Sequence, residues 1–146
     1  MSVTGDKEVI RALKKLGTRS SKALRHGINA TAQQVRNTAI KSIQGQSQGA
    51  VVIRYSQGGG AYEHVASSPG DAPNTDTGAL VKSIAVEQPN DANAFVGTGL
   101  DYGLFLEFGT TNMKPRPWLQ PALDGNIKNL NDNISKSVQR LINERK

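Results

Sequence analysis

The sequence predicts an α+β protein: two long amphipathic helices packed on a small antiparallel sheet, with an extended hairpin arm. Apolar residues recur every three or four positions over residues 6–43 and again from residue 117 onward, which is typical of helices with one apolar face. Two short runs rich in β-branched and aromatic residues, 51–55 and 61–65, flank a glycine-rich link and predict a hairpin. Two further strand-like runs enclose a turn at 89–93 and predict the small sheet.

Composition limits the classes of protein that this chain can represent. Its 146 residues suffice for a single domain, 1–146, with a basic helix at 6–43, a flexible arm at 44–77, and a sheet, elbow and C-terminal helix at 78–146. The absence of cysteine excludes disulfides and thiolate metal sites. We expect no signal peptide and no membrane partner, because the sequence holds no apolar signal core and no run of about 18 apolar residues. An apolar content of only 36% predicts a thin core that neighbouring subunits help to stabilise.

The helix predicted over 6–43 carries most of the positive charge. Residues 1–43 hold nine of the 18 basic residues and two of the 12 acidic ones, a local charge of +7, whereas the rest of the chain carries −1 and the whole chain +6. Gly17 and Gly27 weaken this helix, each by about 1 kcal/mol relative to Ala, so that a break, if one occurs, is expected near Gly17. The commoner interpretation of the basic face is a solvated surface, and the sharper one is a surface for DNA or for an acidic partner. Its candidate residues are Lys14, Lys15, Arg19, Lys22 and Arg25.

Residues 44–77 predict an arm. They are rich in Gly, Ser, Gln, Asn and Pro, and the link at 56–60 joins the two β-like runs in the manner of a hairpin with a flexible tip. Because an isolated hairpin is only marginally stable, such an arm often becomes ordered by packing on a neighbour. We therefore interpret 44–77 as an inter-subunit arm or a mobile loop.

The middle of the chain predicts the small sheet. Thr77 is a capping residue for a short helix over 77–84, which leads into a strand over 83–88. Residues 89–93 form a turn, and 94–98 predict the returning strand.

The stretch 101–123 organises the fold, because it holds two of the three Phe residues, the only Trp and three of the six Pro residues. Aromatic side chains bury the largest apolar areas, so a small core would be anchored here. Asp101 is suited to cap a short helix that Gly109 ends. Residues 114–117 run extended, because each proline disfavours helical geometry in the residue before it. Pro117 then suits the first position of the long C-terminal helix.

No group of residues in the sequence predicts catalysis or a bound metal. His26 and His64 lack partners at metal-ligand spacing on their own elements. His64 with Glu63, Asp71 and Asp76 could form a nuclease-like acidic cluster, but no nucleophile, base and orienting group can be assigned, and a polar loop is the favoured interpretation. We therefore expect no enzymatic activity, no cofactor and no metal.

Two regions of the chain resemble a family of tailed-bacteriophage proteins. The residues that carry the resemblance are Ser-Pro-Gly-Asp-Ala-Pro at 68–73, Asp-Thr-Gly-Ala-Leu at 76–80, Lys-Ser-Ile at 82–84, Leu-Glu-Phe-Gly-Thr at 106–110, Met-Lys-Pro-Arg-Pro-Trp-Leu at 113–119 and Pro-Ala-Leu at 121–123. They resemble, in the same order and at similar separation, the gene-product-ten-like tail-component family, whose members lie at or near the head–tail junction. Trp118 stands where we expect Phe.

The resemblance implies a structural protein of the virion, present in the host cytoplasm during assembly. It would form a ring in the head–tail connector, as a neck, tail-completion or tail-terminator protein, which joins capsid to tail and lets DNA pass. The implied partners are further copies of the chain, for which we expect a six-membered ring, other connector and tail proteins, and passing duplex DNA. The alternative is a basic accessory protein that binds nucleic acid.

A ring needs two complementary patches on each subunit, because closed rings use head-to-tail interfaces. We expect the arm and the stiff Pro-Arg-Pro elbow to supply them. Trp and Arg are enriched at interface hot spots, so Trp118 and Arg116 are the expected anchors, unless Trp118 belongs to the core. Glu107 would otherwise pair with Arg116 or with a neighbour's lysine. The expected interface residues are Tyr55, Tyr62, Glu107, Phe108, Met113, Arg116 and Trp118.

Overall fold

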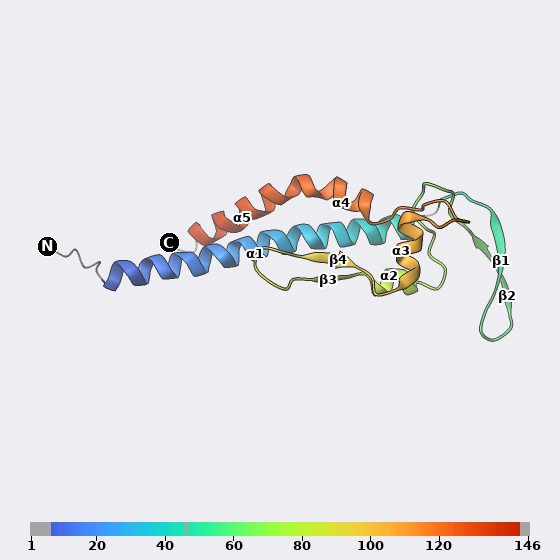
Figure 1. Cartoon of the computed structure of the whole chain (residues 1–146), viewed down its shortest axis with the longest axis horizontal. Helices are drawn as coiled ribbons and strands as arrows, with labels where there is room; N and C mark the ends of the chain where they lie inside the picture. The colour runs from blue at the N-terminus through green and yellow to red at the C-terminus, as the bar shows by residue number, and fades with distance from the viewer. Residues whose placement is uncertain (1–6, 46, 144–146) are drawn as a thin grey trace.

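A computed structural model describes residues 7–45 and 47–143 of the chain. Helix α1 (Lys7–Gln44) contacts most of the other elements. At about 1.5 Å per residue, its 38 residues span about 57 Å. Helices α4 (Gln120–Asn126) and α5 (Leu130–Asn143) lie along one side of α1 (Figure 1). The chain is α+β, which confirms the prediction of fold class. In the described residues no helix is both long and apolar enough to cross a membrane.

Two separate antiparallel hairpins make up the β-structure. Strands β1 (Val51–Tyr55) and β2 (Ala61–Val65) form the predicted arm, which projects from one end of the molecule (Figure 1). Strands β3 (Ala85–Glu87) and β4 (Phe95–Gly97) form a shorter hairpin that packs on α1, on the side opposite to α4 and α5 (Figure 1). Both hairpins confirm the sequence prediction, although the strands of the second are shorter than expected.

The apolar core lies around the C-terminal half of α1. Val35, Ala39 and Ile43 follow one another at intervals of four residues, which places them on one face of that helix. Helix α2 (Ala79–Ser83) packs against this face through Leu80. The buried members of the core are Val35, Ala39, Ile43, Leu80, Ile84, Trp118 and Ala122.

Side-chain hydrogen bonds run along part of the contact between α1 and the C-terminal helices, beside buried alanines such as Ala39 and Ala122. Asn133 Nδ2 donates to Thr31 Oγ1 at 3.0 Å and to Gln34 Oε1 at 3.1 Å, and one helix earlier Asn126 Nδ2 donates to Thr38 Oγ1 at 2.9 Å. Positions three or four residues apart lie on the same face of a helix, so these amides and hydroxyls form a ladder along the contact. Part of the apolar stripe predicted for the C-terminal helix stays on the surface. Ile127 and Ile142 are 50% and 57% exposed.

Gly27 allows α1 and α5 to approach each other closely. A Cβ atom at this position would lie 2.6 Å from the Cα of Ile134, which is closer than real Cβ atoms come. Gly17 has nothing within 4 Å of the corresponding point, and α1 continues through it without a break. Gly27 is therefore a packing position as well as a helix-weakening one.

Helix α3 (Asp101–Phe108) confirms the predicted short helix but is capped differently. Leu100 occupies the N-cap position and Asp101 the first turn, with no side-chain cap hydrogen bond. Asp101 therefore acts only through its charge near the positive end of the helix. Gly109 ends the helix with φ 77° and ψ −176°, a positive-φ conformation that favours glycine but differs from the left-handed helical conformation expected there.

The C-terminal helix differs from the prediction in two respects. It begins at Gln120 rather than at Pro117, and a 3-10 turn, η1 (Ile127–Asn129), separates α4 from α5. The helix starts late because the side chain of Glu107 caps it at Gln120. Glu107 also organises the candidate site.

Candidate functional site

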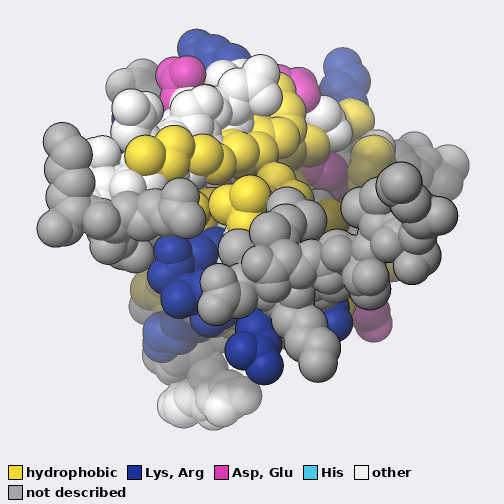
Figure 2. Space-filling model, turned by 90° about the vertical axis from the view of Figure 1, so that its left-hand side faces the viewer, with side chains coloured by type: hydrophobic (Ala, Val, Ile, Leu, Met, Phe, Trp, Pro, Cys, Tyr) yellow, Lys and Arg dark blue, Asp and Glu magenta, His cyan; other side chains and the backbone are white. Residues whose placement is uncertain are grey.

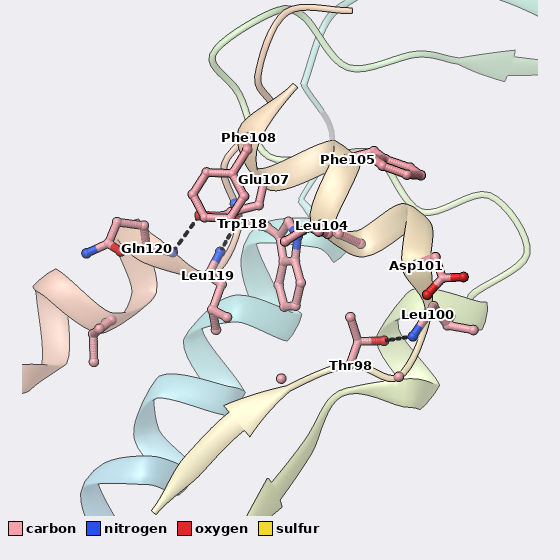
Figure 3. Close-up of a pocket in the computed structure, with 14 residues that line it drawn as sticks. Thr98, Leu100, Asp101, Leu104, Phe105, Glu107, Phe108, Trp118, Leu119 and Gln120 are labelled. Carbon is pink, nitrogen blue, oxygen red and sulfur yellow. Dashed lines mark hydrogen bonds between the residues drawn. The ribbon is translucent and has the colours of Figure 1, made fainter. Parts of the chain in front are cut away.

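A buried carboxylate joins helix α3 to helix α4. Glu107, in the last turn of α3, accepts backbone N–H bonds from Trp118 and Leu119 at Oε2 and from Gln120 at Oε1, each at 2.9 Å (Figure 3). N–H groups at the start of a helix lack partners within it, and a negative charge suits the positive end of the helix dipole. Glu107 is therefore the cap of α4, and it fixes the position of α4 relative to α3.

Trp118 packs beneath this cap. Its side chain is 2% exposed, and Nε1 donates to the backbone oxygen of Gly103 at 3.1 Å. A Cβ atom at Gly103 would lie 2.5 Å from Thr98 Cγ2, so the backbone of α3 packs tightly against the loop that follows β4. The indole of Trp118 and the tightly packed backbone at Gly103 form the floor of a groove.

Above this floor lies a groove of about 690 Å³ between α3, the start of α4 and the loop after β4 (Figure 3). Its walls carry Leu104, Phe105, Phe108 and Leu123, which are 60%, 49%, 71% and 39% exposed. Clustered apolar side chains with this much exposure mark interaction sites more often than scattered ones do. We call the surface formed by Leu104, Phe105, Phe108, Leu119 and Leu123 the apolar groove.

The Pro-Arg-Pro elbow is bonded to the body of the protein rather than free. The Arg116 backbone N–H donates to the oxygen of Leu106 at 2.7 Å, and the Gly70 N–H donates to the oxygen of Pro115 at 2.9 Å. The guanidinium Nη1 of Arg116 donates to both the backbone oxygen and the hydroxyl of Ser67. The two regions that carry the family resemblance therefore meet in space and hold each other in place.

The arm has two unlike faces. Residues directly opposite each other in an antiparallel pair lie on the same face, and Val51 pairs with Val65. Val51, Ile53 and Tyr55 therefore share one face with Val65. The side chains of Val51, Ile53 and Tyr55 are 60%, 55% and 75% exposed. We call the apolar residues Val51, Ile53, Tyr55 and Val65 the arm face; the exposed Glu63, paired with Ile53, lies on the same side of the hairpin. Within the described residues nothing covers this apolar row.

The opposite face of the arm is tied to the loop before α2. The Tyr62 hydroxyl donates to Asp76 Oδ1 at 2.7 Å, Arg54 Nε lies 3.7 Å from Asp76 Oδ2, and His64 Nδ1 lies 3.9 Å from Asp76 Oδ1. The hydrogen bond to the Asp76 carboxylate raises the pKa of Tyr62, because a phenolate there would lose the bond and face a like charge.

The base of the arm is also braced. Asn74 Nδ2 donates to the backbone oxygens of Ser47 and Val65 at 2.9 and 2.8 Å, and its Oδ1 accepts the Ser47 N–H at 2.9 Å. A Cβ atom at Gly49 would lie 1.9 Å from the oxygen of Ala66, so the two chains of the base are in close contact. These contacts hold the arm so that it points away from the body (Figure 1).

Three of the expected interface residues belong to the interior of the protomer. Glu107 is 9% exposed and Trp118 2%, and the donors of Arg116 are directed at Ser67. Glu107 and Arg116 do not pair with each other, because each has other partners. In the protomer Glu107 and Trp118 support the apolar groove from beneath, and Trp118→Ala is expected to destabilise the protomer by about 3–5 kcal/mol.

The other expected interface residues lie on the apolar groove, on the two faces of the arm and in the loop after α3. Phe108 lies on the apolar groove and Tyr55 on the arm face, both largely exposed. Tyr62 lies on the opposite face of the arm, and Met113 is half-buried and forms a backbone bridge with Thr110.

Sequence reasoning missed several exposed apolar residues. Leu104, Phe105 and Leu123 line the groove, and Ile53 lies at the centre of the arm face. A signal was present, because the consecutive apolar residues Leu104, Phe105 and Leu106 face different sides of a helix and cannot all pack against one core.

The basic residues of α1 remain at the surface. Lys and Arg side chains gather on one side of the end of the molecule that Figure 2 shows. Arg25 forms an ion pair with Asp91, its Nη1 lying 3.3 Å from Oδ1, whereas Arg36 turns inward and donates from Nε to the oxygen of Ile84 at 2.8 Å. The exposed members of the expected set are Lys14, Lys15, Lys22 and Arg25, and Arg19 is half-buried.

The four residues considered for a nuclease-like cluster do not come together as a group, although two of them are close. Glu63 lies opposite Ile53 on the arm face, whereas His64 and Asp76 meet at the other face, and Asp71 is exposed elsewhere. In the part of the chain that the structure describes, no group of three His, Asp or Glu side chains could hold a metal ion.

One comparison with known proteins gives a match. Residues 7–109, more than two thirds of the chain, match the HK97-gp10-like family, whose description reads "Bacteriophage HK97-gp10, putative tail-component". No curated protein and no solved structure matches the chain. The matched residues run from α1 to the end of α3, so they include the arm and Glu107 but not the elbow or α4.

Proposed function

Because the chain belongs to the HK97-gp10-like tail-component family, we propose that it is a non-enzymatic structural subunit of the virion that forms a ring in the head–tail connector. The ring joins capsid to tail, as a neck, tail-completion or tail-terminator protein, and lets DNA pass. We propose six copies per ring. The observation that carries this proposal is that the protomer exposes two unlike apolar surfaces, the arm face and the apolar groove.

Two unlike patches on one protomer favour a head-to-tail contact, in which the arm face of one copy meets the groove of the next. The braced base directs the arm away from the body, so the arm does not fold back onto its own groove (Figure 1). Alternate strand residues are about 6.6 Å apart, so Val51, Ile53 and Tyr55 present a row about 13 Å long. A groove of about 690 Å³ is large enough to receive several side chains of such a row.

The energetics favour a closed ring over an isolated dimer. Full burial of an exposed Val, Ile or similar side chain contributes about 1.5–3 kcal/mol, so Val51, Ile53 and Tyr55, which are already partly covered, supply at most about 5–9 kcal/mol. Association of two proteins costs about 4–15 kcal/mol in lost translational and rotational freedom. One arm–groove contact is therefore weak, whereas a closed ring gives every subunit two contacts and no free end.

A mixing experiment tests the head-to-tail contact. Ile53→Asp damages the arm face and Phe108→Asp damages the groove, and both residues are more than half exposed, so each protomer should still fold. Native mass spectrometry should show each variant alone as a monomer. Their mixture should form nothing larger than a heterodimer, and that only at high protein concentration, because only the intact groove of one and the intact arm of the other can pair and a single contact is weak.

The control is Ile142→Asp, which places the same charge on an apolar side chain that is 57% exposed but lies on α5, outside both surfaces. It should assemble like the natural chain. Loss of assembly in this control, or unchanged assembly of Ile53→Asp, would be incompatible with the proposed interface.

A further inference from the structure

A third surface, on the opposite half of α1 from the core, has a different chemistry. It is a shallow groove of about 500 Å³ between α1 and α5. Arg19, Lys22 and His26 from α1 and Arg140 from α5 line it, and no acidic residue does. We call these four residues the basic groove.

The helix geometry explains why these residues converge. Arg19, Lys22 and His26 are spaced by three and four residues, which puts them on one face of α1 about 5–6 Å apart. The close approach at Gly27 brings α5 against α1, and with it Arg140, which is more than 100 positions away in the sequence. The result is a row of nitrogen-bearing side chains about 10 Å long, of which Arg19 and Lys22 are cations, with the further cation Arg140 beside it.

The charges of this groove have no acidic partner in the described part of the chain. No carboxylate described there lies within 4.0 Å of the charged nitrogens of Arg19, Lys22 or Arg140. The α1 cation that does form an ion pair, Arg25 with Asp91, is outside the lining of the groove. The groove is thus a set of like charges that attracts an anion with several negative groups in a row.

We propose that the basic groove binds the phosphate backbone of duplex DNA without reading its sequence. Duplex DNA carries a negative charge about every 1.7 Å of its axis, so a short row of cations finds phosphates in any register. A protein partner fits less well, because the centres of protein interfaces are enriched in aromatic residues and Met as well as Arg, and the groove contains Arg and Lys but no aromatic residue and no Met. This proposal goes beyond the assembly function and does not depend on the arm or the apolar groove.

Fluorescence anisotropy of the full chain with labelled duplexes of two unrelated sequences tests the proposal. Both duplexes should bind equally well. If about four cations contact phosphates, counting Lys15 one turn before Arg19, log affinity should fall against log salt with a slope of about −3 to −4. The affinity should then drop about 100-fold between about 50 and 200 mM salt.

Single charge reversals locate the site. Lys22→Glu and Arg140→Glu should each weaken binding about tenfold or more and flatten the salt slope. Lys41→Glu makes the same charge change on an exposed residue at the other end of α1, and should alter the affinity less than about threefold. Circular dichroism and thermal unfolding check that all three variants fold.

Three results would overturn the proposal. Equal effects of Lys41→Glu and Lys22→Glu would show that net charge, not the groove, attracts DNA. An unchanged affinity of Arg140→Glu would show that α5 takes no part. Displacement of the DNA by polyglutamate at a much lower charge concentration than by inorganic polyphosphate would show that the groove prefers an acidic protein to phosphate.

Discussion

Replacing Glu107 by Gln tests whether the buried carboxylate holds α4 in place. The carboxylate accepts three backbone N–H bonds at 2.9 Å, two at Oε2 and one at Oε1. A Gln side chain keeps the shape, but its amide nitrogen must face at least one of these N–H groups, so a bond is lost and two donors oppose each other. A hydrogen bond to a charged group contributes about 1.5–3 kcal/mol, and a charge at a helix end about 0.3–1 kcal/mol. We expect the free energy of unfolding to fall by about 2–4 kcal/mol.

Urea unfolding followed by circular dichroism measures this change, at a protein concentration where only one oligomeric species is present. Glu87→Gln, the same substitution at an exposed position of β3, is the control and should stay within about 0.5 kcal/mol of the natural chain. Glu107→Ala, which removes both acceptor atoms, should cost more than Glu107→Gln. A cost below about 1 kcal/mol for Glu107→Gln would refute the capping role.

The remaining predictions concern the helix crossing and the arm base. Gly27→Ala should destabilise the protein by about 1–3 kcal/mol, because the new methyl group would meet Ile134, whereas Gly17→Ala should stabilise it by about 1 kcal/mol; equal effects in urea unfolding would contradict the close crossing. Tyr62 has a pKa raised above its ordinary value of 10.0 by its hydrogen bond to Asp76, so it stabilises the arm base below pH 10.0, and this contribution disappears as the pH rises through the raised pKa. Asp76→Asn should return the pKa of Tyr62 toward its ordinary value in an NMR titration, and an unchanged pKa would argue against the hydrogen bond.

The fold could be predicted because its elements are determined by neighbouring residues. The apolar spacing of α1, the β-branched runs of the arm and the glycine at 109 all act within a few positions. The start of α4 could not be predicted in this way, since Glu107 lies 11 to 13 residues before the N–H groups that it accepts. The same limit applies to Trp118. A tryptophan suits an interface anchor as well as a core position, and only the packing of the fold shows that Trp118 is buried in the protomer.

For the functional surfaces too, features set by neighbouring residues could be predicted, and features set by residues distant in the sequence could not. Lys22 and its neighbours could be recognised as a basic stripe, because one helix carries them all. Arg140 could not be assigned to that stripe, because which helices pack together depends on the polar ladder and on the close approach at Gly27. Phe108 was expected at an interface, whereas the exposure of Leu104 and Phe105 was not predicted, because it depends on which side of α3 the rest of the fold covers.

The proposed place of this protein in the virion is tested most directly by electron microscopy of lysates from a phage that lacks this gene. We expect DNA-filled heads beside unattached tails, because without the connector ring the two cannot be joined. Tails of normal length would assign a neck or joining role, and tails of irregular length a terminator that stops growth of the tube. Normal, infectious particles would contradict the connector proposal.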